Sequence, residues 1–85
     1  MTTLTQTPPE TVDRRIDARG SFCPGPLMEL IRVIRESEVG TIISVRSSDR
    51  GSRIDIPRWI EKAGHRLVGV SPAEGFDEIV VQKLH

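Results

Sequence analysis

The stretch FCPGPLMELIRVIRE, residues 22–36, contains the clearest helix boundary in this 85-residue chain. Pro24 and Pro26 fall within a single turn, which a helix tolerates only at its start, where the missing N–H groups would have no intrahelical acceptor in any case. The apolar residues beyond them recur at helical spacing: Leu27, Leu30, Ile31 and Ile34. The pattern predicts a helix over residues 24–36, with Pro24 at its first position and Cys23 at or next to the N-cap.

Strand patterns lie on both sides of this helix. Residues 14–18 predict a short first strand, and the β-branched run at residues 41–47 predicts a second. Residues 66–70 and 76–83 predict two more, and the Ser-Pro-Ala-Glu-Gly segment at residues 71–75 between them has the composition of a turn. The last two strands are therefore expected to form an antiparallel hairpin.

A second helix is predicted between the second and third strands, ending at Ala63 before Gly64. Its start is open to two interpretations. Ser52 followed three residues later by Asp55 resembles a capping box, whereas Asp55 as the cap itself would place Pro57 in the first turn. We expect the helix to begin between Ser52 and Asp55, and we interpret Asp55 as a capping residue.

The order of elements is therefore β-α-β-α-β-β. Two helices and four strands in this order predict an α+β fold: a two-layer α/β sandwich in which both helices cover one face of a mixed four-stranded sheet. Residues 1–13 are rich in threonine and proline and offer little apolar surface to bury, so we expect a flexible N-terminal tail. Residues 14–85 then form a single domain.

Composition narrows the classes of function. Twelve basic residues balance twelve acidic residues, whereas proteins that bind nucleic acid usually carry a basic excess, so direct nucleic-acid binding is not expected. The chain has one cysteine, which excludes an internal disulfide and indicates a reducing compartment. No segment has the apolar length of a membrane span or the pattern of a signal peptide, so we expect a cytoplasmic protein.

Cys23 is the candidate reactive group. The partial positive charge at a helix N-terminus stabilises an anion, so a thiol there ionises more readily than a free cysteine, and the thiolate is the nucleophilic form. Pro24 and Pro26 weaken this effect, because each removes an amide donor. The simpler alternative is a small buried hydrophobic residue, the commonest role of a free cysteine, but the loop position before a helix favours the reactive role.

Two motifs resemble a known family. Asp-Ala-Arg-Gly at residues 17–20, followed by Cys-Pro-Gly-Pro-Leu at residues 23–27, is similar to the Cys-Pro-x-Pro signature of the TusA-like (SirA/YedF) sulfur carrier proteins. Asp-Ile-Pro at residues 55–57 and Gly-His-Arg-Leu at residues 64–67 provide a second match. The resemblance covers residues 14–84.

The resemblance implies the sandwich fold described above and a carrier role for Cys23, which would accept sulfur as a persulfide and pass it to a partner protein. The implied partners are cysteine desulfurases, DsrE-like sulfurtransferases, rhodaneses and heterodisulfide-reductase-like proteins. No cofactor is implied other than the covalent sulfur adduct on Cys23. The implied pathways are sulfur oxidation, tRNA thiolation and molybdenum cofactor assembly.

One departure from the family bears on the pathway. Members of the tRNA branch often carry a second cysteine in the second helix, close to the position of Ile60 here. Because this chain lacks that cysteine, it has a single reactive sulfur. The Pro-Gly-Pro-Leu-Met-Glu version of the motif, residues 24–29, looks more like members encoded with sulfur-oxidation enzymes, whose cargo would be a thiosulfonate or a persulfide. The expected function is a sulfur relay in cytoplasmic sulfur oxidation, with the other pathways and a non-catalytic interaction module as alternatives.

Several other residues are candidates for supporting roles. Arg19 would either stabilise an anionic adduct or remain a solvated surface residue, and Asp17 is expected to bond local amides of the loop. Met28 would either form an apolar rim around the cysteine or pack half-buried. Three arginines near the start of the second helix would form a docking surface for partners or a solvated face: Arg50, Arg53 and Arg58.

Metal binding is not expected. One cysteine and two separated histidines, His65 and His85, do not form a zinc site. His65 follows the glycine that ends the second helix, and it is expected to hydrogen-bond the last carbonyl groups of that helix rather than to act as a base.

Overall fold

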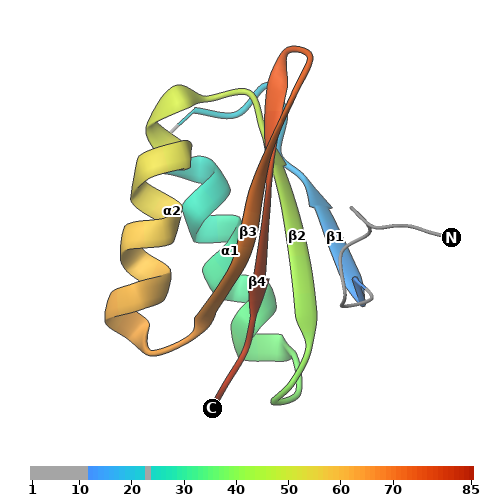
Figure 1. Ribbon diagram of the computed structural model, residues 1–85, viewed down its shortest axis with the longest axis vertical. Helices are drawn as coiled ribbons and strands as arrows, with labels where there is room; N and C mark the ends of the chain where they lie inside the picture. The colour runs from blue at the N-terminus through green and yellow to red at the C-terminus, as the bar shows by residue number, and fades with distance from the viewer. Residues whose placement is uncertain (1–11, 23) are drawn as a thin grey trace, which may run out of the picture.

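The computed structural model describes residues 12–22 and 24–85, and this part of the chain contains six regular elements. In chain order these are β1 (Arg14–Asp17), α1 (Gly25–Glu36), β2 (Ile42–Ser47), α2 (Arg50–Ala63), β3 (Arg66–Ala73) and β4 (Phe76–Gln82) (Figure 1). The predicted β-α-β-α-β-β order is confirmed. Cys23 and residues 1–11 of the predicted tail lie outside the described residues.

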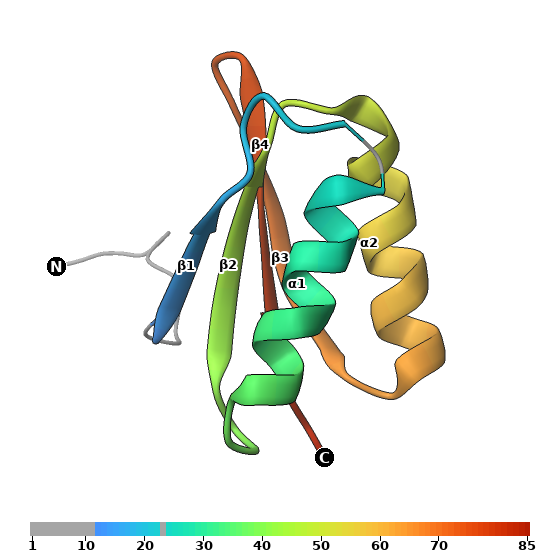
Figure 2. The same ribbon diagram turned by 180° about the vertical axis from the view of Figure 1, so that it is seen from behind.

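The four strands of the described chain form one mixed sheet in the order β1-β2-β4-β3. β1 and β2 are parallel, and β4 lies antiparallel between β2 and β3. Both helices pack against the same face of the sheet, as Figures 1 and 2 show from opposite sides. The predicted α+β two-layer sandwich is therefore confirmed.

Hydrogen bonding to β2 begins at Asp13, directly before β1. The Asp13 amide donates to the Ile42 carbonyl at 2.8 Å, and Asp13 Oδ2 accepts from the Ile42 amide at 2.9 Å. The sheet contacts of the domain thus include Asp13, which the sequence pattern assigns to the N-terminal tail.

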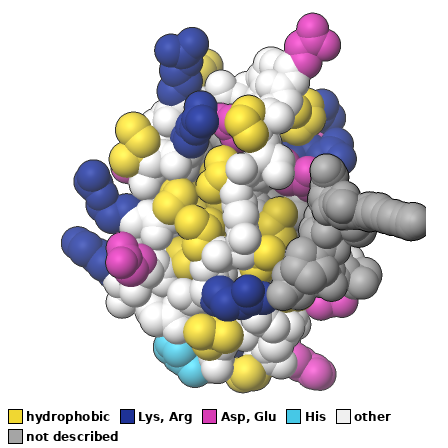
Figure 3. Space-filling view, viewed as in Figure 1, with side chains coloured by type: hydrophobic (Ala, Val, Ile, Leu, Met, Phe, Trp, Pro, Cys, Tyr) yellow, Lys and Arg dark blue, Asp and Glu magenta, His cyan; other side chains and the backbone are white. Residues whose placement is uncertain are grey.

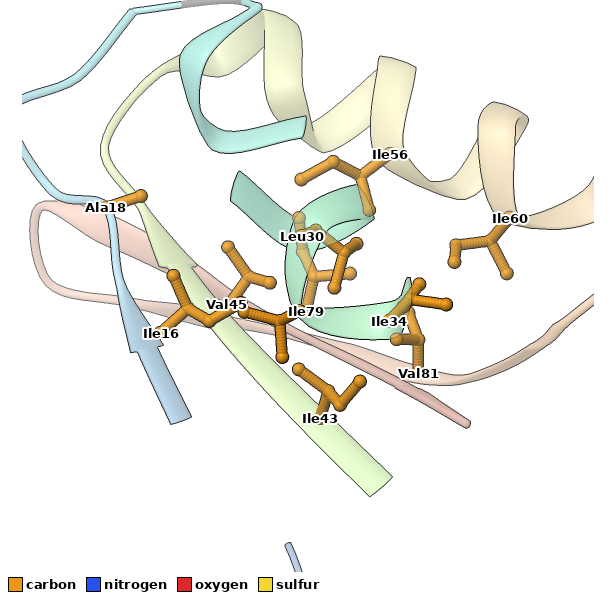
Figure 4. Packing of buried hydrophobic residues seen from close by; sticks show 11 residues of the cluster. Ile16, Ala18, Leu30, Ile34, Ile43, Val45, Ile56, Ile60, Ile79 and Val81 are labelled. Atoms are coloured by element: carbon orange, nitrogen blue, oxygen red, sulfur yellow. The ribbon is translucent and has the colours of Figure 1, made fainter. Parts of the chain in front are cut away.

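The core fills the space between the sheet and the two helices (Figure 4). Four strand residues at its centre have no exposed surface: Ile43, Val45, Ile79 and Val81. Side chains from both helices cover them: Leu30, Val33 and Ile34 from α1, and Ile56 and Ile60 from α2. Of the apolar residues predicted for the buried face of α1, Leu30 and Ile34 lie in the core, whereas Ile31 is only half-buried. Val33, which the pattern did not include, is also buried in the core.

The second helix begins earlier than predicted. Asp49 is the N-cap residue of α2, and its Oδ2 accepts hydrogen bonds from the Ser52 amide at 3.1 Å and from Ser52 Oγ at 3.2 Å. Asp55 lies in the second turn and is not the cap, so the predicted start between Ser52 and Asp55 is wrong. Pro57 falls in the helix interior, where the complete burial of Ile56 next to it offsets the lost backbone hydrogen bond.

The β3–β4 hairpin is longer than predicted. β3 continues to Ala73, which pairs with the first residue of β4, so the turn contains only Glu74 and Gly75. Gly75 has a φ of +84°, a conformation that a residue without a Cβ adopts readily. The predicted turn over residues 71–75 is wrong because β3 is an edge strand, and such a strand accommodates a proline such as Pro72 on its unpaired side.

Replacing Asp49 tests the observed cap. Asp49→Ala removes the side-chain acceptor for the Ser52 amide and is expected to lower the free energy of unfolding by about 1 kcal/mol. Asp49→Asn keeps an acceptor oxygen and should stay close to wild type in urea denaturation. Equal losses for the two variants would contradict the cap.

Candidate functional site

The site lies where three loops meet at one end of the sheet. β1 and β2 are parallel and β3 runs in the same direction, so the loops that follow these three strands lie at the same end (Figures 1 and 2). The first of these loops contains Cys23 and leads into α1, the second leads into α2, and the third is the turn of the β3–β4 hairpin. The topology thus places the starts of both helices next to each other and next to the hairpin.

The loop between β1 and α1 is bonded to the loop before α2. The Gly20 amide donates to Ser48 Oγ at 2.9 Å, and the Ser21 amide donates to the Ala18 carbonyl at 3.1 Å. Gly20 has a φ of +92°, which favours glycine at this turn. These bonds hold residues 18–22 against the segment that precedes α2.

Helix α1 begins one residue later than predicted. Pro24 is the N-cap residue, with φ −96° and ψ 18°, and Pro26 is the second helical residue. Pro24 fits the N-cap as well as the first helical position, because neither position requires an amide donor. The Gly25 amide donates to the Phe22 carbonyl at 2.7 Å, so a hydrogen bond connects the two sides of the Cys-Pro segment. In the sequence Cys23 directly precedes the N-cap residue, which is one of the two predicted alternatives.

The start of α1 provides fewer amide donors than a typical helix N-terminus. Pro24 and Pro26 have no N–H group, and the Gly25 N–H is already bonded to Phe22. Unpaired amides form the positive end of a helix, so the capacity of this end to stabilise an anion is reduced. The electrostatic support for a thiolate or persulfide at Cys23 is therefore weaker than at an open helix end.

Asp17 and Arg19 form a bidentate ion pair at the start of this loop. Arg19 Nε donates to Asp17 Oδ1 and Arg19 Nη2 donates to Asp17 Oδ2, both at 2.8 Å, and the Arg19 amide donates to Oδ1 at 3.2 Å. The side-chain hydrogen bonds from Arg19, followed by its backbone hydrogen bond, lower the pKa of Asp17 from 3.8 to about 2. The expected bond from Asp17 to a local amide is present. Arg19 was predicted either to stabilise an anionic adduct or to remain a solvated surface residue. In the structure its charge is instead balanced by Asp17.

Two large apolar side chains near Cys23 in the sequence are exposed. Phe22 is 78% exposed and Met28 is 59% exposed. Met28 therefore has the exposure of an apolar rim rather than that of a half-buried packing residue. The sequence does not single out Phe22, because loop residues have no periodicity from which burial can be inferred. Its position directly before the cysteine is the one signal that could have identified it.

The three predicted docking arginines do not form a single surface. Arg50 and Arg53 line a hollow of about 310 Å³ together with Phe76 and Asp77 of the hairpin, and Arg53 Nη1 lies 4.0 Å from Asp77 Oδ1. Arg58 instead lines a second hollow of about 500 Å³ between α2 and β3. Arg58 is five residues beyond Arg53, and five residues turn a helical side chain by roughly 140°. In Figure 3 several basic side chains lie apart from one another along the left side of the molecule, and others lie at the lower centre and the upper right, so they do not gather in one patch.

His65 lies at the opposite end of the molecule, between α2 and β3. Its Nδ1 accepts a hydrogen bond from the Leu84 amide at 3.1 Å, and its ring stacks on that of His85 with the centroids 4.6 Å apart. Burial, together with the charges of His85 and Lys83, lowers the pKa of His65 from 6.5. His85 contacts the last turn of α2, with its Nε2 at 2.8 Å from the Ala63 carbonyl oxygen. The predicted bond from His65 to the last helix carbonyls is made by its backbone amide, which donates to the Ile60 carbonyl at 3.0 Å, whereas its ring contacts the chain segment that follows β4.

The described part of the chain contains neither a cluster of metal ligands nor a helix that could span a membrane. Its histidine, aspartate and glutamate side chains include no group of three or more that could hold a metal ion. Neither α1 nor α2 is long and apolar enough to cross a membrane.

The Asp17 carboxylate gives the domain a testable pH dependence. A carboxyl group whose pKa is lower in the folded state adds stability above its unfolded value of 3.8, and this contribution disappears as the pH falls toward the folded value of about 2. Asp17→Asn removes the ionisable group, so the wild type should melt at a higher temperature than the variant at about pH 5 and approach it between about pH 4 and about pH 2. A difference that stays constant over this range would contradict the ion pair.

Comparison with known proteins identifies relatives over most of the chain. The family model described as sulfurtransferase TusA matches residues 14–83. An Archaeoglobus fulgidus protein assigned as a sulfur carrier protein is 55% identical over 69 residues, which cover 81% of this chain and 94% of that protein. The sulfur carrier protein TusA of Pseudomonas syringae pv. syringae is 40% identical over 65 residues, which cover 76% of this chain and 77% of that protein.

A solved structure has the same fold. A SirA-like protein from Desulfitobacterium hafniense superimposes with a TM-score of 0.75 at 23% sequence identity, covering 86% of this chain and 100% of that one. The segment that matches the family model, residues 14–83, includes every helix and strand described above and the loop with the Cys-Pro-Gly-Pro sequence. By its sequence, this chain belongs to the TusA family.

Proposed function

We propose that this protein is a sulfur carrier that holds sulfur on Cys23, as a persulfide or a thiosulfonate, and relays it to partner proteins. The observation that carries the proposal is the family match, which spans residues 14–83 and includes the Cys-Pro-Gly-Pro sequence at residues 23–26. Cys23 is the one cysteine of the chain, so no other residue can supply a thiolate. Phe22 and Pro24, on either side of it, are both exposed, which supports access of a partner to this loop.

Sulfur transfer at such a site is an exchange of S–S bonds. The Cys23 thiolate attacks the outer sulfur of a donor persulfide, a new S–S bond forms, and the donor leaves as a thiolate with the electron pair of the broken bond. Attack on an inner sulfur of tetrathionate forms a thiosulfonate in the same way and releases thiosulfate. An acceptor thiolate then attacks the transferred sulfur and regenerates the Cys23 thiolate. Neither step needs an added oxidant or reductant.

The carrier contributes little to this reaction beyond the nucleophile. Arg19 is engaged by Asp17, and His65 lies at the opposite end of the molecule, so neither is placed to take a proton from the thiol. A thiol that is already ionised needs no general base. The donor and acceptor proteins would then supply the remaining catalytic groups.

We place the relay in cytoplasmic sulfur oxidation. The Pro-Gly-Pro-Leu-Met-Glu version of the motif, residues 24–29, supports this branch. Members of the tRNA branch often carry a second cysteine where this chain has Ile60. Because Cys23 is the one cysteine here, sulfur on Cys23 must leave through another protein. The proposed partners are DsrE-like, rhodanese and heterodisulfide-reductase-like proteins. A relay from a cysteine desulfurase toward tRNA thiolation or molybdenum cofactor assembly is the alternative.

Intact-mass spectrometry tests the carrier function. Wild-type protein incubated with tetrathionate or polysulfide should gain an adduct that a reductant removes, because an S–S bond to a thiol is reversible. Cys23→Ala should gain none. An adduct of the same mass on Cys23→Ala would show that Cys23 is not the carrier residue.

A non-catalytic interaction module is the competing class of function. In that case Cys23 would be part of a contact surface and would react as slowly as an ordinary exposed thiol. Wild-type protein that remains without an adduct under excess donor would favour this alternative.

Phe22 and Met28 are the proposed anchor for a partner, because both are largely exposed and because aromatic residues and methionine are enriched at the core of protein–protein interfaces. The double variant Phe22→Ala, Met28→Ala is expected to transfer sulfur to an acceptor rhodanese about tenfold more slowly at limiting acceptor concentration. Val39→Ala is the control, since Val39 is 65% exposed but lies beyond the other end of α1. Equal rates for the double variant and the control would remove both residues from the docking surface.

A further inference from the structure

One aromatic ring is shared by two arginines next to the Cys23 loop. Phe76 is the first residue of β4, and its ring centroid lies 5.2 Å from Cζ of Arg19 and 5.6 Å from Cζ of Arg46. A guanidinium group within about 6 Å of a ring centroid is attracted by the negative face of the ring. The ring therefore connects the β3–β4 hairpin with the loop that follows β1 and with β2.

Arg46 contributes to both sides of this connection. In the register of the sheet it lies opposite Asp17 of β1 and Glu78 of β4. Its Nε is buried and has no hydrogen-bond partner among the described residues, so the Phe76 ring contacts a guanidinium group that is incompletely hydrogen-bonded. Its carbonyl accepts a hydrogen bond from the Ala18 amide at 2.8 Å, which holds the first residue of the loop on β2.

These contacts form a continuous path from the hairpin to the loop. The Phe76 ring lies against Arg19, and both the side chain and the amide of Arg19 are bonded to the Asp17 carboxylate. Arg19 belongs to residues 18–22, which lead directly to Cys23. Without the ring, one face of the Arg19 guanidinium group would lose its contact. The Arg19 side chain would then be held by its ion pair with Asp17, and the loop backbone by the hydrogen bonds of residues 18–21.

We propose that Phe76 is a positioning residue for sulfur transfer: by holding Arg19 over its ring, it holds the loop that presents Cys23. This proposal rests on the proposed function of Cys23. In this arrangement the charge of Arg19 fixes the loop through Asp17 and the Phe76 ring. Phe76 also lines the hollow that contains Arg50 and Arg53, so a partner bound in that hollow touches the ring that positions the loop.

The test is the rate at which Cys23 reacts with iodoacetamide, measured between about pH 6 and about pH 9.5. Phe76→Leu keeps an apolar side chain and removes the ring face. We expect its alkylation rate at neutral pH to fall about threefold and the midpoint of its pH–rate profile to move upward, because a looser loop no longer holds the thiolate at the start of α1. Phe76→Tyr keeps the ring face and should restore the wild-type profile.

Val80→Ala is the matched control, since Val80 and Phe76 project from the same face of β4 by strand alternation. This variant should lower the melting temperature without moving the pH–rate profile. A Phe76→Leu profile that coincides with that of the wild type overturns the proposal. A Val80→Ala profile that moves as far as that of Phe76→Leu also overturns it, because the effect would then follow stability alone.

Arg19→Lys supplies a second measurement, because lysine keeps the charge but cannot form the bidentate bond. The single variant Arg19→Lys should slow alkylation by the same factor of about three. This measurement remains a test of the proposal even if Phe76→Leu fails to fold. The double variant should react no more slowly than the slower single variant, since both changes act through one contact. Effects that multiply would show that the ring does not act through Arg19 and would overturn the proposal. Iodoacetamide reacts with the thiol alone and needs no sulfur donor. Failure of the Phe76 proposal in this assay is therefore distinguishable from failure of the carrier function, which would appear as the absence of a sulfur adduct.

Discussion

Burial of the central strand pair determines where every other part of the domain lies. Four inward-facing residues of β2 and β4 have no exposed surface and are covered by α1 and α2: Ile43, Val45, Ile79 and Val81. Complete burial of one such side chain contributes about 1.5–3 kcal/mol, so both helices are held on this face of the sheet. Because β1 and β2 are parallel, the two helices that follow them begin at the same end. The location of the site follows from this packing.

At that end of the sheet, polar and aromatic contacts take the place of apolar burial. The side chains of Arg19 and Asp17 are 46% and 56% exposed, and exposed ion pairs contribute little to the free energy of folding. Their importance lies in the conformation of the loop, because the same carboxylate also accepts the Arg19 amide and the same guanidinium lies against Phe76. The fold therefore depends on the core, and the geometry of the loop before α1 depends on this small surface cluster together with the hydrogen bonds of Ala18, Gly20 and Ser21.

A proposed carrier has requirements different from those of an enzyme with an enclosed pocket. Its thiol must be reached by both a donor and an acceptor, and the adduct must be stable enough to carry but easy to release. Exposed Phe22 and Met28 beside the cysteine suit the first requirement. The helix start suits the second, since Pro24 and Pro26 remove amide donors that would otherwise stabilise an anionic adduct more strongly.

Local patterns in the sequence were sufficient to predict the order of elements, the two-layer fold and the single candidate nucleophile, because strand alternation, helical spacing and a lone cysteine are visible without any long-range contact. Element ends required the tertiary structure. Pro57 is tolerated inside α2 because Ile56 and Ile60 of the same helix are completely buried in the core, and Pro72 is tolerated in β3 because that strand lies at the edge of the sheet. The cap at Asp49 lay outside the predicted start because Pro57 lies inside the helix rather than in its first turn. The contact of Phe76 with Arg19 joins residues far apart in the chain, and only the packing of β4 beside β2 brings them together.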